Sequence, residues 1–551
     1  MATEAGVGDE IHVTDTVLPL ERGRRFALPR VSIGRRTMAV LVFARDWHGL
    51  LLAGALGLIA AFVTARVNHF VNPAFDDSYI TLTFARNLAD HGMLSFDGHT
   101  WSTGATSPLH VMILAAVLKA GGAPLFSSVA VGFASHVLLC MSVWWLTLAI
   151  FHNRLAAILG ALAMAWIPYA TFDVVNGLET GLFMALVTAT VASYLSWRGR
   201  KGRIATGWLL ALGILCRPEG AFLVPALVLY RWIERKKGEP MREYIKDVLS
   251  MGLPACVGLG IVSGYSFIVN GSLSGTATVK MQFFQENKFP LREKIAIAGD
   301  NISIFLGPVL TLCALALIPR RRELALVLLF WAPILVLYTL LFPGSLFHYF
   351  YRYQHPILPF IAVFAAGGAY QLLAIASQRD ILVKLMVGVA SFIVIVPLWQ
   401  HYDRWRDLTG GSMAEQRYDL SAMAQELNML VLPSQTLATH DIGTVGYYAK
   451  YKVMDLVGLV NPDIVPYHDG RRVPEYLAKN EPDFILIFPG WDYDYLHIDP
   501  NHYKDKYQYV AEFKGGPIRK YSYFLWRVVH TKDRPWYPGE QLQENPDAEW
   551  P

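Results

Sequence analysis

The sequence predicts an α-helical membrane protein that crosses the bilayer about eleven times and ends in a small α/β domain. The 551 residues are 54% hydrophobic and 17% charged, and the mean hydropathy is +0.33, which is too apolar for an ordinary soluble domain. Apolar runs recur whose length, about 20 residues, is what a helix needs to cross a hydrocarbon core. Short basic blocks separate these runs, so the orientation of each predicted span can be tested.

The N-terminal segment, residues 1–46, is rich in arginine and is expected to be cytoplasmic. The first apolar run, His48–Val67, follows this long segment and not a short basic tip, so we expect a retained signal anchor. The other predicted spans are at 127–151, 155–174, 182–197, 204–216, 219–232, 248–269, 302–319, 324–342, 356–376 and 381–400.

Alternation of these spans places the later basic blocks in the cytoplasm as well, as the positive-inside rule requires. They comprise Arg154, Arg198, Arg200, Lys201, Arg203, Arg235, Lys236, Lys237, Arg242, Lys246, Arg320, Arg321, Arg322 and Arg379. The scheme needs a hinge at Arg217–Gly220 between two short helices, and it needs 109–121 to lie along the outer interface. We therefore predict a transmembrane module, 47–400, in a bacterial inner membrane, with its first outer loop at 68–126.

The segment 401–540 is predicted to be an extracytoplasmic α/β domain, and 541–551 a disordered tail. Its amphipathic stretch Tyr418–Leu430 indicates a helix. Five short runs rich in β-branched and aromatic residues indicate strands. They are Thr436–Thr439, Val453–Leu456, Phe484–Phe488, Tyr507–Phe513 and Tyr521–Val529.

Several classes of function lack sequence support. The net charge of +4 comes with no basic stripe interleaved with aromatic residues, so no nucleic-acid partner is expected. The four cysteines lie in apolar runs without CxxC spacing, which favours small hydrophobic residues over disulfides or zinc ligands. The sequence contains no GxxxxGK[ST], GxGxxG, HExxH or GxSxG motif, which removes the usual signs of nucleotide, dinucleotide, zinc-protease or serine-hydrolase chemistry.

The first outer loop carries two adjacent carboxylates, Asp76 and Asp77. One interpretation is that either caps a helix beginning near Ser78, where the helix dipole favours negative charge. The other is that one carboxylate is a general base and its neighbour binds a cation or a sugar hydroxyl. The sequence leaves both open, and a divalent cation is possible, although two carboxylates are an incomplete Mg²⁺ or Ca²⁺ site.

Three cations are predicted on the outer face, against the orientation rule: Arg217, Lys280 and Arg352. Their convergence would suit an anion such as a lipid phosphate. Two alternatives stay open at this stage. Arg352 would snorkel among the aromatic residues of 347–353, and Arg217 would form a salt bridge with Glu219 or Glu179.

Three segments of the first loop carry a family resemblance: Asp76-Asp77-Ser78-Tyr79-Ile80, Phe84–Ala89 and Thr106-Ser107-Pro108. They resemble the GT-C superfamily of membrane glycosyltransferases, including the mycobacterial terminal arabinofuranosyltransferases. Later segments are similar to further signatures of these enzymes: Asn176–Thr180, Arg217–Gly220, Arg352-Tyr353 and Asp441–Tyr447. Asp90-His91-Gly92 departs from their longer glycine-bearing phrase, and the tail is shorter.

The resemblance implies an inverting transfer from a polyprenyl-phosphate sugar donor to a hydroxyl of a glycan, lipid or protein acceptor. Asp76 is then the first choice for the base and Asp77 the second acidic position, although the order can be exchanged. Arg352, Arg217 and Lys280 would hold the donor phosphate. The candidates for substrate binding are Tyr79, Glu179, His348 and Asp441. The sugar is not implied.

Two other classes compete with this prediction. A transporter or flippase for a lipid-linked or anionic substrate has the same body plan, but the sequence shows no internal symmetry, and the acidic pair is predicted in a loop. An assembly or sensor protein would use its outer domain to bind a partner, and Asp76 would then be functionally replaceable.

Overall fold

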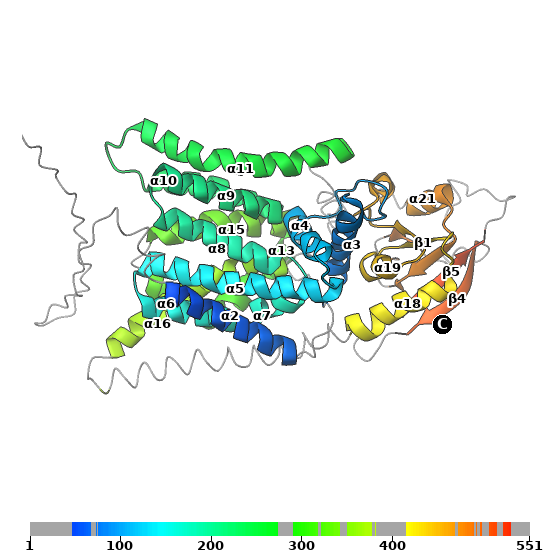
Figure 1. Ribbon diagram of the computed structural model, residues 1–551, viewed down its shortest axis with the longest axis horizontal. Helices are drawn as coiled ribbons and strands as arrows, with labels where there is room; N and C mark the ends of the chain where they lie inside the picture. The colour runs from blue at the N-terminus through cyan, green and yellow to red at the C-terminus, as the bar shows by residue number, and fades with distance from the viewer. Residues whose placement is uncertain are drawn as a thin grey trace, which may run out of the picture.

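The structure is a computed structural model with a helical module and a C-terminal α/β domain at one end of it (Figure 1). The residues that it describes are 47–67, 73, 75–273, 290–317, 321–341, 350–376, 381, 415–468, 472–489, 492, 496–498, 506–514 and 522–529.

The helical module consists of apolar helices packed side by side along the long axis of the molecule (Figure 1). They are α2 (Trp47–Val67), α5 (Pro124–Phe151), α6 (Arg154–Trp166), α7 (Pro168–Val175), α8 (Thr180–Ser196), α9 (Gly199–Cys216), α10 (Leu223–Ile233), α11 (Met241–Asn270), α13 (Leu291–Leu306), α14 (Leu310–Leu317), α15 (Arg321–Leu341) and α16 (Leu358–Ala376). Most of these elements coincide with predicted spans.

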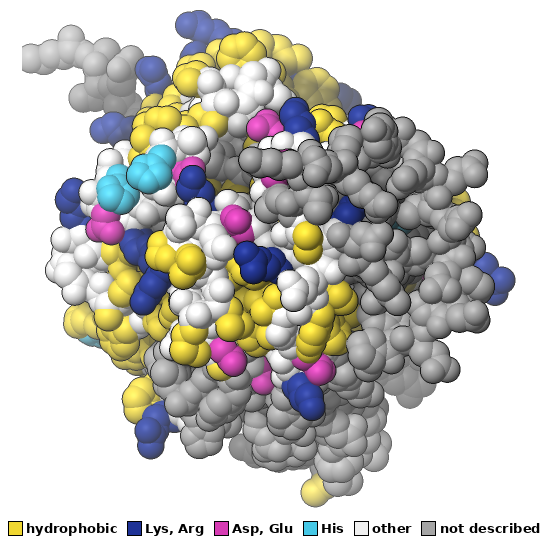
Figure 2. Space-filling model, turned by 90° about the vertical axis from the view of Figure 1, so that its right-hand side faces the viewer, with side chains coloured by type: hydrophobic (Ala, Val, Ile, Leu, Met, Phe, Trp, Pro, Cys, Tyr) yellow, Lys and Arg dark blue, Asp and Glu magenta, His cyan; other side chains and the backbone are white. Residues whose placement is uncertain are grey.

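Within the described ranges, five helices are long and apolar enough to cross a membrane, and the pair α6 and α7, bent by 56°, would make a sixth. The predicted total of about eleven spans stays a prediction, and its last span, 381–400, falls almost entirely outside the described residues. Side chains such as Leu51 and Phe62 on α2 are each 59% exposed, as expected of a lipid-facing surface. In contrast, acidic, basic and apolar side chains are interspersed on the end that carries the α/β domain (Figure 2).

The predicted hinge between two short helices is confirmed. Helix α9 ends at Cys216, and the 3₁₀ turn η1 (Pro218–Phe222) separates it from α10. Proline has no N–H to continue α9 and disfavours helical geometry in the residue before it. A Cβ on Gly220 would lie 2.7 Å from the carbonyl carbon of Gly213, so the chain folds closely back on α9.

The helices α3 (Asp76–His91) and α4 (Pro108–Lys119) lie between the helical module and the α/β domain (Figure 1). The predicted capping of this helix by Asp76 or Asp77 is wrong, because the N-cap residue is Phe75 and both carboxylates belong to the first turn. They still lie where the helix dipole favours negative charge. Helix α3 ends at Gly92, whose φ of +70° is the left-handed conformation typical of a helix stop.

The α/β domain contains one five-stranded sheet in the order β2-β1-β3-β5-β4. Its strands, β1 (Thr436–Thr439), β2 (Lys452–Asp455), β3 (Phe484–Ile487), β4 (Tyr507–Phe513) and β5 (Tyr523–Val528), confirm the five predicted ones. β1 pairs in parallel with β2 and β3, and β5 pairs antiparallel with β3 and β4. The domain also contains the π-helical turn η5 (Glu415–Leu420), η6 (Pro462–Ile464), α18 (Ser421–Leu430), α19 (Gly443–Tyr448), α20 (Val465–His468) and α21 (Val473–Asn480).

The α/β domain shares a hydrophobic core with α3 and α4. Phe84 of α3 and Leu114 of α4 belong to the same buried cluster as Ile442 and Leu456 of the domain. The ring of Tyr79 is fully buried, with its centre 5.3 Å from that of Tyr447. Burial of this apolar area stabilises the packing of the C-terminal domain on α3 and α4.

Candidate active site

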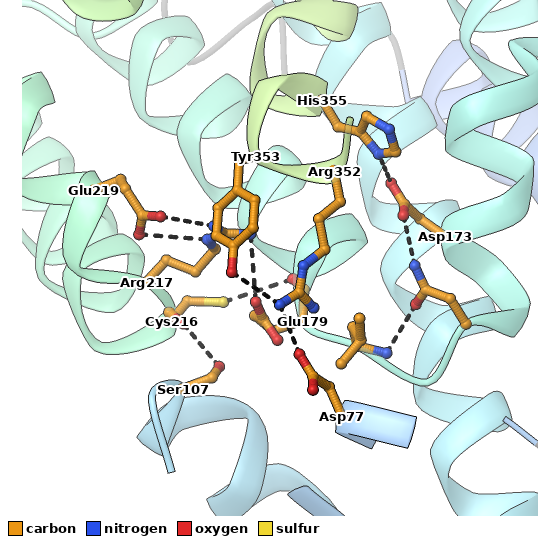
Figure 3. A network of polar contacts seen from close by, with 12 residues as sticks. Asp77, Ser107, Asp173, Glu179, Cys216, Arg217, Glu219, Arg352, Tyr353 and His355 are labelled. Atoms are coloured by element: carbon orange, nitrogen blue, oxygen red, sulfur yellow. Dashed lines mark hydrogen bonds and ion pairs between the residues drawn. The ribbon is translucent and has the colours of Figure 1, made fainter. Parts of the chain in front are cut away.

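Two buried arginines from distant segments flank one tyrosine ring at the end of the helical module near α3 (Figure 3). Arg217 lies at the break between α9 and η1, and Arg352 begins the 3₁₀ turn η4 (Arg352–Ile357). The guanidinium carbon of each is 4.9 Å from the ring centre of Tyr353. Such contacts favour a cation against the ring face and hold both side chains in the interior.

The charge of Arg217 is matched by two carboxylates. Its Nη2 lies 2.7 Å from Glu219, and its Nη1 lies 3.4 Å from Glu179. The hydroxyl of Tyr338 also donates a hydrogen bond to Glu219. The salt-bridge alternative is therefore confirmed, with both predicted partners. Ser107 of the predicted Thr-Ser-Pro motif ties this break to the first loop, because its hydroxyl donates to the carbonyl of Cys216 at 2.7 Å.

Arg352 contacts the acidic loop. Its Nη2 lies 3.0 Å from Oδ2 of Asp77 and donates to the Tyr353 hydroxyl at 3.1 Å. The Arg352 side chain is 6% exposed, so the predicted snorkelling towards water is wrong. Asp77 keeps 18% of its side chain accessible. The loop that carries Asp77 and one of the predicted cations thus meet, although 275 positions separate Asp77 from Arg352.

Asp76 contacts the α/β domain instead. Its two carboxylate oxygens accept hydrogen bonds from the backbone N–H groups of Gly443, at 3.0 Å, and Thr444, at 2.7 Å. Burial, together with the neighbouring carboxylate of Asp441, raises the pKa of Asp76 to about 7. The adjacent carboxylates therefore have different partners: Asp77 contacts the helical module and Asp76 holds the C-terminal domain.

Asp441 belongs to a polar cluster behind Asp76. The Tyr523 hydroxyl donates to Asp441, and His440 lies 2.9 Å from Asp492 and 3.5 Å from Asp441. Burial opposes the charge of His440, but Asp492 and Asp441 outweigh it and raise its pKa to about 9. This cluster follows the carboxyl ends of β1 and β3, the edge at which open α/β sheets commonly bind ligands.

The other predicted site residues divide into three groups. Glu179 lies in the site, beside Arg217. Tyr79 lies instead in the interface with the α/β domain, where it packs against Tyr447 and Tyr448. Lys280 and His348 are outside the described residues. As for the possible divalent cation, no group of three or more His, Cys, Asp or Glu side chains in the described part of the chain could hold a metal.

Sequence reasoning missed a buried polar group formed by Asp173, Asn176 and His355 (Figure 3). Asp173 Oδ2 lies 2.8 Å from His355 Nδ1, and Asp173 Oδ1 accepts a hydrogen bond from Asn176. A signal was present, since Asp173 stands inside the predicted apolar span 155–174, where a charged residue is costly and marks a functional region.

Solved structures share the architecture of this chain. ArnT from Cupriavidus metallidurans bound to undecaprenyl phosphate aligns at 14% identity over 87% of this chain and 98% of its own, with a TM-score of 0.55. Its apo form aligns at 16% identity, over 88% and 98%, with the same TM-score of 0.55. The Archaeoglobus fulgidus oligosaccharyltransferase tethered with an acceptor peptide aligns at 13% identity, over 88% and 74%, with a TM-score of 0.52.

The chain has the GT-C fold. At these identities the likeness establishes the fold and not the reaction. A mycobacterial arabinofuranosyltransferase, AftD, aligns with a TM-score of 0.47 over 42% of its length, which is too weak a likeness to indicate the sugar. A family model described as "Domain of unknown function (DUF8728)" matches residues 406–536, the α/β appendage to the GT-C helices. No curated protein shows significant sequence similarity to the chain.

Proposed function

We propose that this protein is an inverting glycosyltransferase that moves a sugar from a polyprenyl-phosphate donor to an acceptor hydroxyl at the outer face of a bacterial inner membrane. The observation that carries the proposal is the 3.0 Å contact between Asp77 and Arg352 on a GT-C scaffold. A carboxylate and a buried cation, delivered by segments far apart in the chain, are the two groups that such a transfer needs.

The reaction follows from these two groups. The acceptor oxygen forms a bond to the anomeric carbon from the face opposite the phosphate, and the bond from that carbon to the phosphate oxygen breaks. The acceptor proton passes to the carboxylate, and the electron pair of the broken bond leaves with the polyprenyl phosphate. A phosphate leaves as a stable anion, so the site needs a cation to stabilise its charge and needs no general acid. Arg352 supplies that cation.

The geometry supports Asp77 as the base in preference to Asp76, the first choice from the sequence. Both oxygens of Asp76 accept backbone hydrogen bonds from Gly443 and Thr444, which commits this carboxylate to the α/β domain. Asp77 is partly accessible and contacts the arginine proposed for the donor phosphate. A phosphate that binds Arg352 competes with Asp77 for the guanidinium and leaves the carboxylate available for the acceptor proton.

Two of the solved structures support the proposed classes of donor and acceptor. The ArnT structure holds undecaprenyl phosphate within the same fold, which supports a polyprenyl-phosphate donor here. The oligosaccharyltransferase structure carries an acceptor peptide, so the fold leaves glycan, lipid and protein acceptors open. On the acceptor side we assign Asp441, whose side chain is 23% accessible and lies near Asp76, and we assign acceptor recognition to the α/β domain.

The test is transfer of radiolabel from a polyprenyl-phosphate sugar pool to endogenous acceptor by the purified full-length protein. Asp77→Asn should lower the rate about 100-fold or more, because a general base is lost. Asp90→Asn, at the exposed end of the same helix, is the matched control and should leave the rate unchanged. Transfer at the wild-type rate by Asp77→Asn would refute the assignment, and absence of transfer by the wild-type protein would favour a transporter.

A further inference from the structure

Asp173, near the end of α7, contacts His355 and Asn176, which belong to two turns next to the proposed site. Its side chain is 1% exposed and that of its partner His355 is 0% exposed. Oδ2 lies 2.8 Å from His355 Nδ1, while Oδ1 accepts a hydrogen bond from Asn176 at 2.7 Å. Through these two partners the Asp173 carboxylate is connected to the segments that carry Arg352 and Asp77.

The hydrogen-bond partners fix the proton count of this pair. His355 Nε2 lies 2.9 Å from the carbonyl oxygen of Phe350, which can only accept, so Nε2 carries a hydrogen. The contact between Nδ1 and Asp173 then holds one further proton between two groups that would otherwise both be acceptors. The pair as a whole is neutral, and it is deeply buried. Removal of one partner would leave the other unmatched in the interior.

On one side, the pair holds the turn that delivers Arg352. Phe350 and Tyr351 have φ values of +59° and +66°, in the left-handed region that bulky residues rarely adopt. Two consecutive residues persist there only if the surroundings hold them. The hydrogen bond from His355 to the Phe350 carbonyl closes this turn from its far side, and Arg352 follows immediately.

On the other side, the pair holds a turn that packs on the acidic helix. Asn176 Oδ1 accepts a hydrogen bond from the backbone N–H of Leu178 at 2.8 Å, and Gly177 between them has a φ of +78°. A Cβ on Gly177 would lie 2.8 Å from that of Ser78, the residue after Asp77. Glu179, the partner of Arg217, follows in the same turn.

We propose that Asp173 and His355 form a positioning pair. By holding the turn that precedes Arg352 and the turn that packs on α3, the pair keeps Arg352 and Asp77 at their observed separation. The inference rests on the proposed function for its meaning in catalysis, but its geometry is independent of that function. His355 acts through Arg352, and Asp173 acts through His355 and Asn176.

A double-mutant cycle tests the proposal. The probe is undecaprenyl phosphate, titrated into the full-length protein in nanodiscs. His355→Gln should weaken its binding about tenfold in the wild-type background and less than about twofold in an Arg352→Ala background, because residues that act through one another are non-additive. His136→Gln is the matched control. His136 is also a buried histidine bonded to a backbone carbonyl, that of Ala165 at 3.2 Å, and its loss should leave binding unchanged.

An equal loss in both backgrounds would overturn the positioning role. If Arg352→Ala itself leaves phosphate binding unchanged, the proposed donor site fails, and hydrogen exchange of residues 350–357 then decides the inference alone. Faster exchange of this segment in His355→Gln than in His136→Gln supports it, and equal exchange refutes it. Should His355→Gln fail to fold, Asp173→Asn keeps the side-chain shape and should give the same pattern.

Discussion

Replacement of Gly443 with alanine is expected to separate the α/β domain from the acidic helix. An added Cβ would lie 2.1 Å from the carbonyl oxygen of Asp76 and 2.3 Å from its Oδ2, where contact needs roughly 3.5 Å. The domain must therefore shift by more than about 1 Å, which stretches the hydrogen bonds from Gly443 and Thr444 beyond bonding distance. Above pH 7, where Asp76 is ionised, hydrogen bonds to this charged group contribute about 1.5–3 kcal/mol each, so docking weakens by roughly 3–6 kcal/mol.

The same displacement should also slow the proposed transfer reaction. Asp77, the proposed base, is the next residue of α3, and displacement of a reacting group by about 1 Å costs on the order of 100-fold in rate. The assays are radiolabel transfer and hydrogen exchange of α3, which should exchange faster in Gly443→Ala. Gly252→Ala in α11 is the control, because nothing lies within 4 Å of its added Cβ. Wild-type transfer together with wild-type exchange in Gly443→Ala would refute the coupling between the domain and Asp77.

Two further predictions concern the charges. The pKa of Asp76 rises from 3.8 to about 7 on burial, so the folded protein keeps a proton that the unfolded chain loses. The free energy of unfolding should therefore fall by a few kcal/mol at most as the pH rises from about 4 to 7. Thermal unfolding of Asp76→Asn should depend less on pH than that of the wild-type protein. Identical pH profiles of the two proteins would contradict this prediction. Arg217→Gln leaves Glu219 and Glu179 buried without their cation and should cost about 3–5 kcal/mol of stability. The double variant Arg217→Gln/Glu219→Gln should recover part of the loss in the same unfolding assay, and no recovery would count against the pairing.

Local patterns of the sequence predicted much of the fold. Apolar length located the helices, strand periodicity located all five strands, and the balance of basic blocks located the break at Arg217. These features depend on neighbouring residues, so one sequence is enough to find them. One wrong prediction also has a local cause. Asp76 and Asp77 do not cap α3, because the helix begins two residues before Ser78.

The site was predicted as a set of residues and not as an arrangement. Asp76 and Gly443 are 367 positions apart, and Asp173 and His355 are 182 apart. Such pairs depend on how helices pack, and a single sequence carries no sign of that packing. The direction of each aspartate was therefore open. Adjacent positions of a helix point about 100° apart, which lets Asp77 meet Arg352 while Asp76 meets the α/β domain.

The two neighbouring aspartates limit how this protein can be recombined. A chimera that exchanges only residues 406–536 for a homologous domain would cut through the core shared with α3 and α4 and through both hydrogen bonds to Asp76. A unit that keeps this core and these two hydrogen bonds consists of α3, α4 and the α/β domain together. If the α/β domain recognises the acceptor as proposed, engineering of acceptor choice has to carry the loop with Asp76 and Asp77 along with this domain, or begin from point changes within the domain.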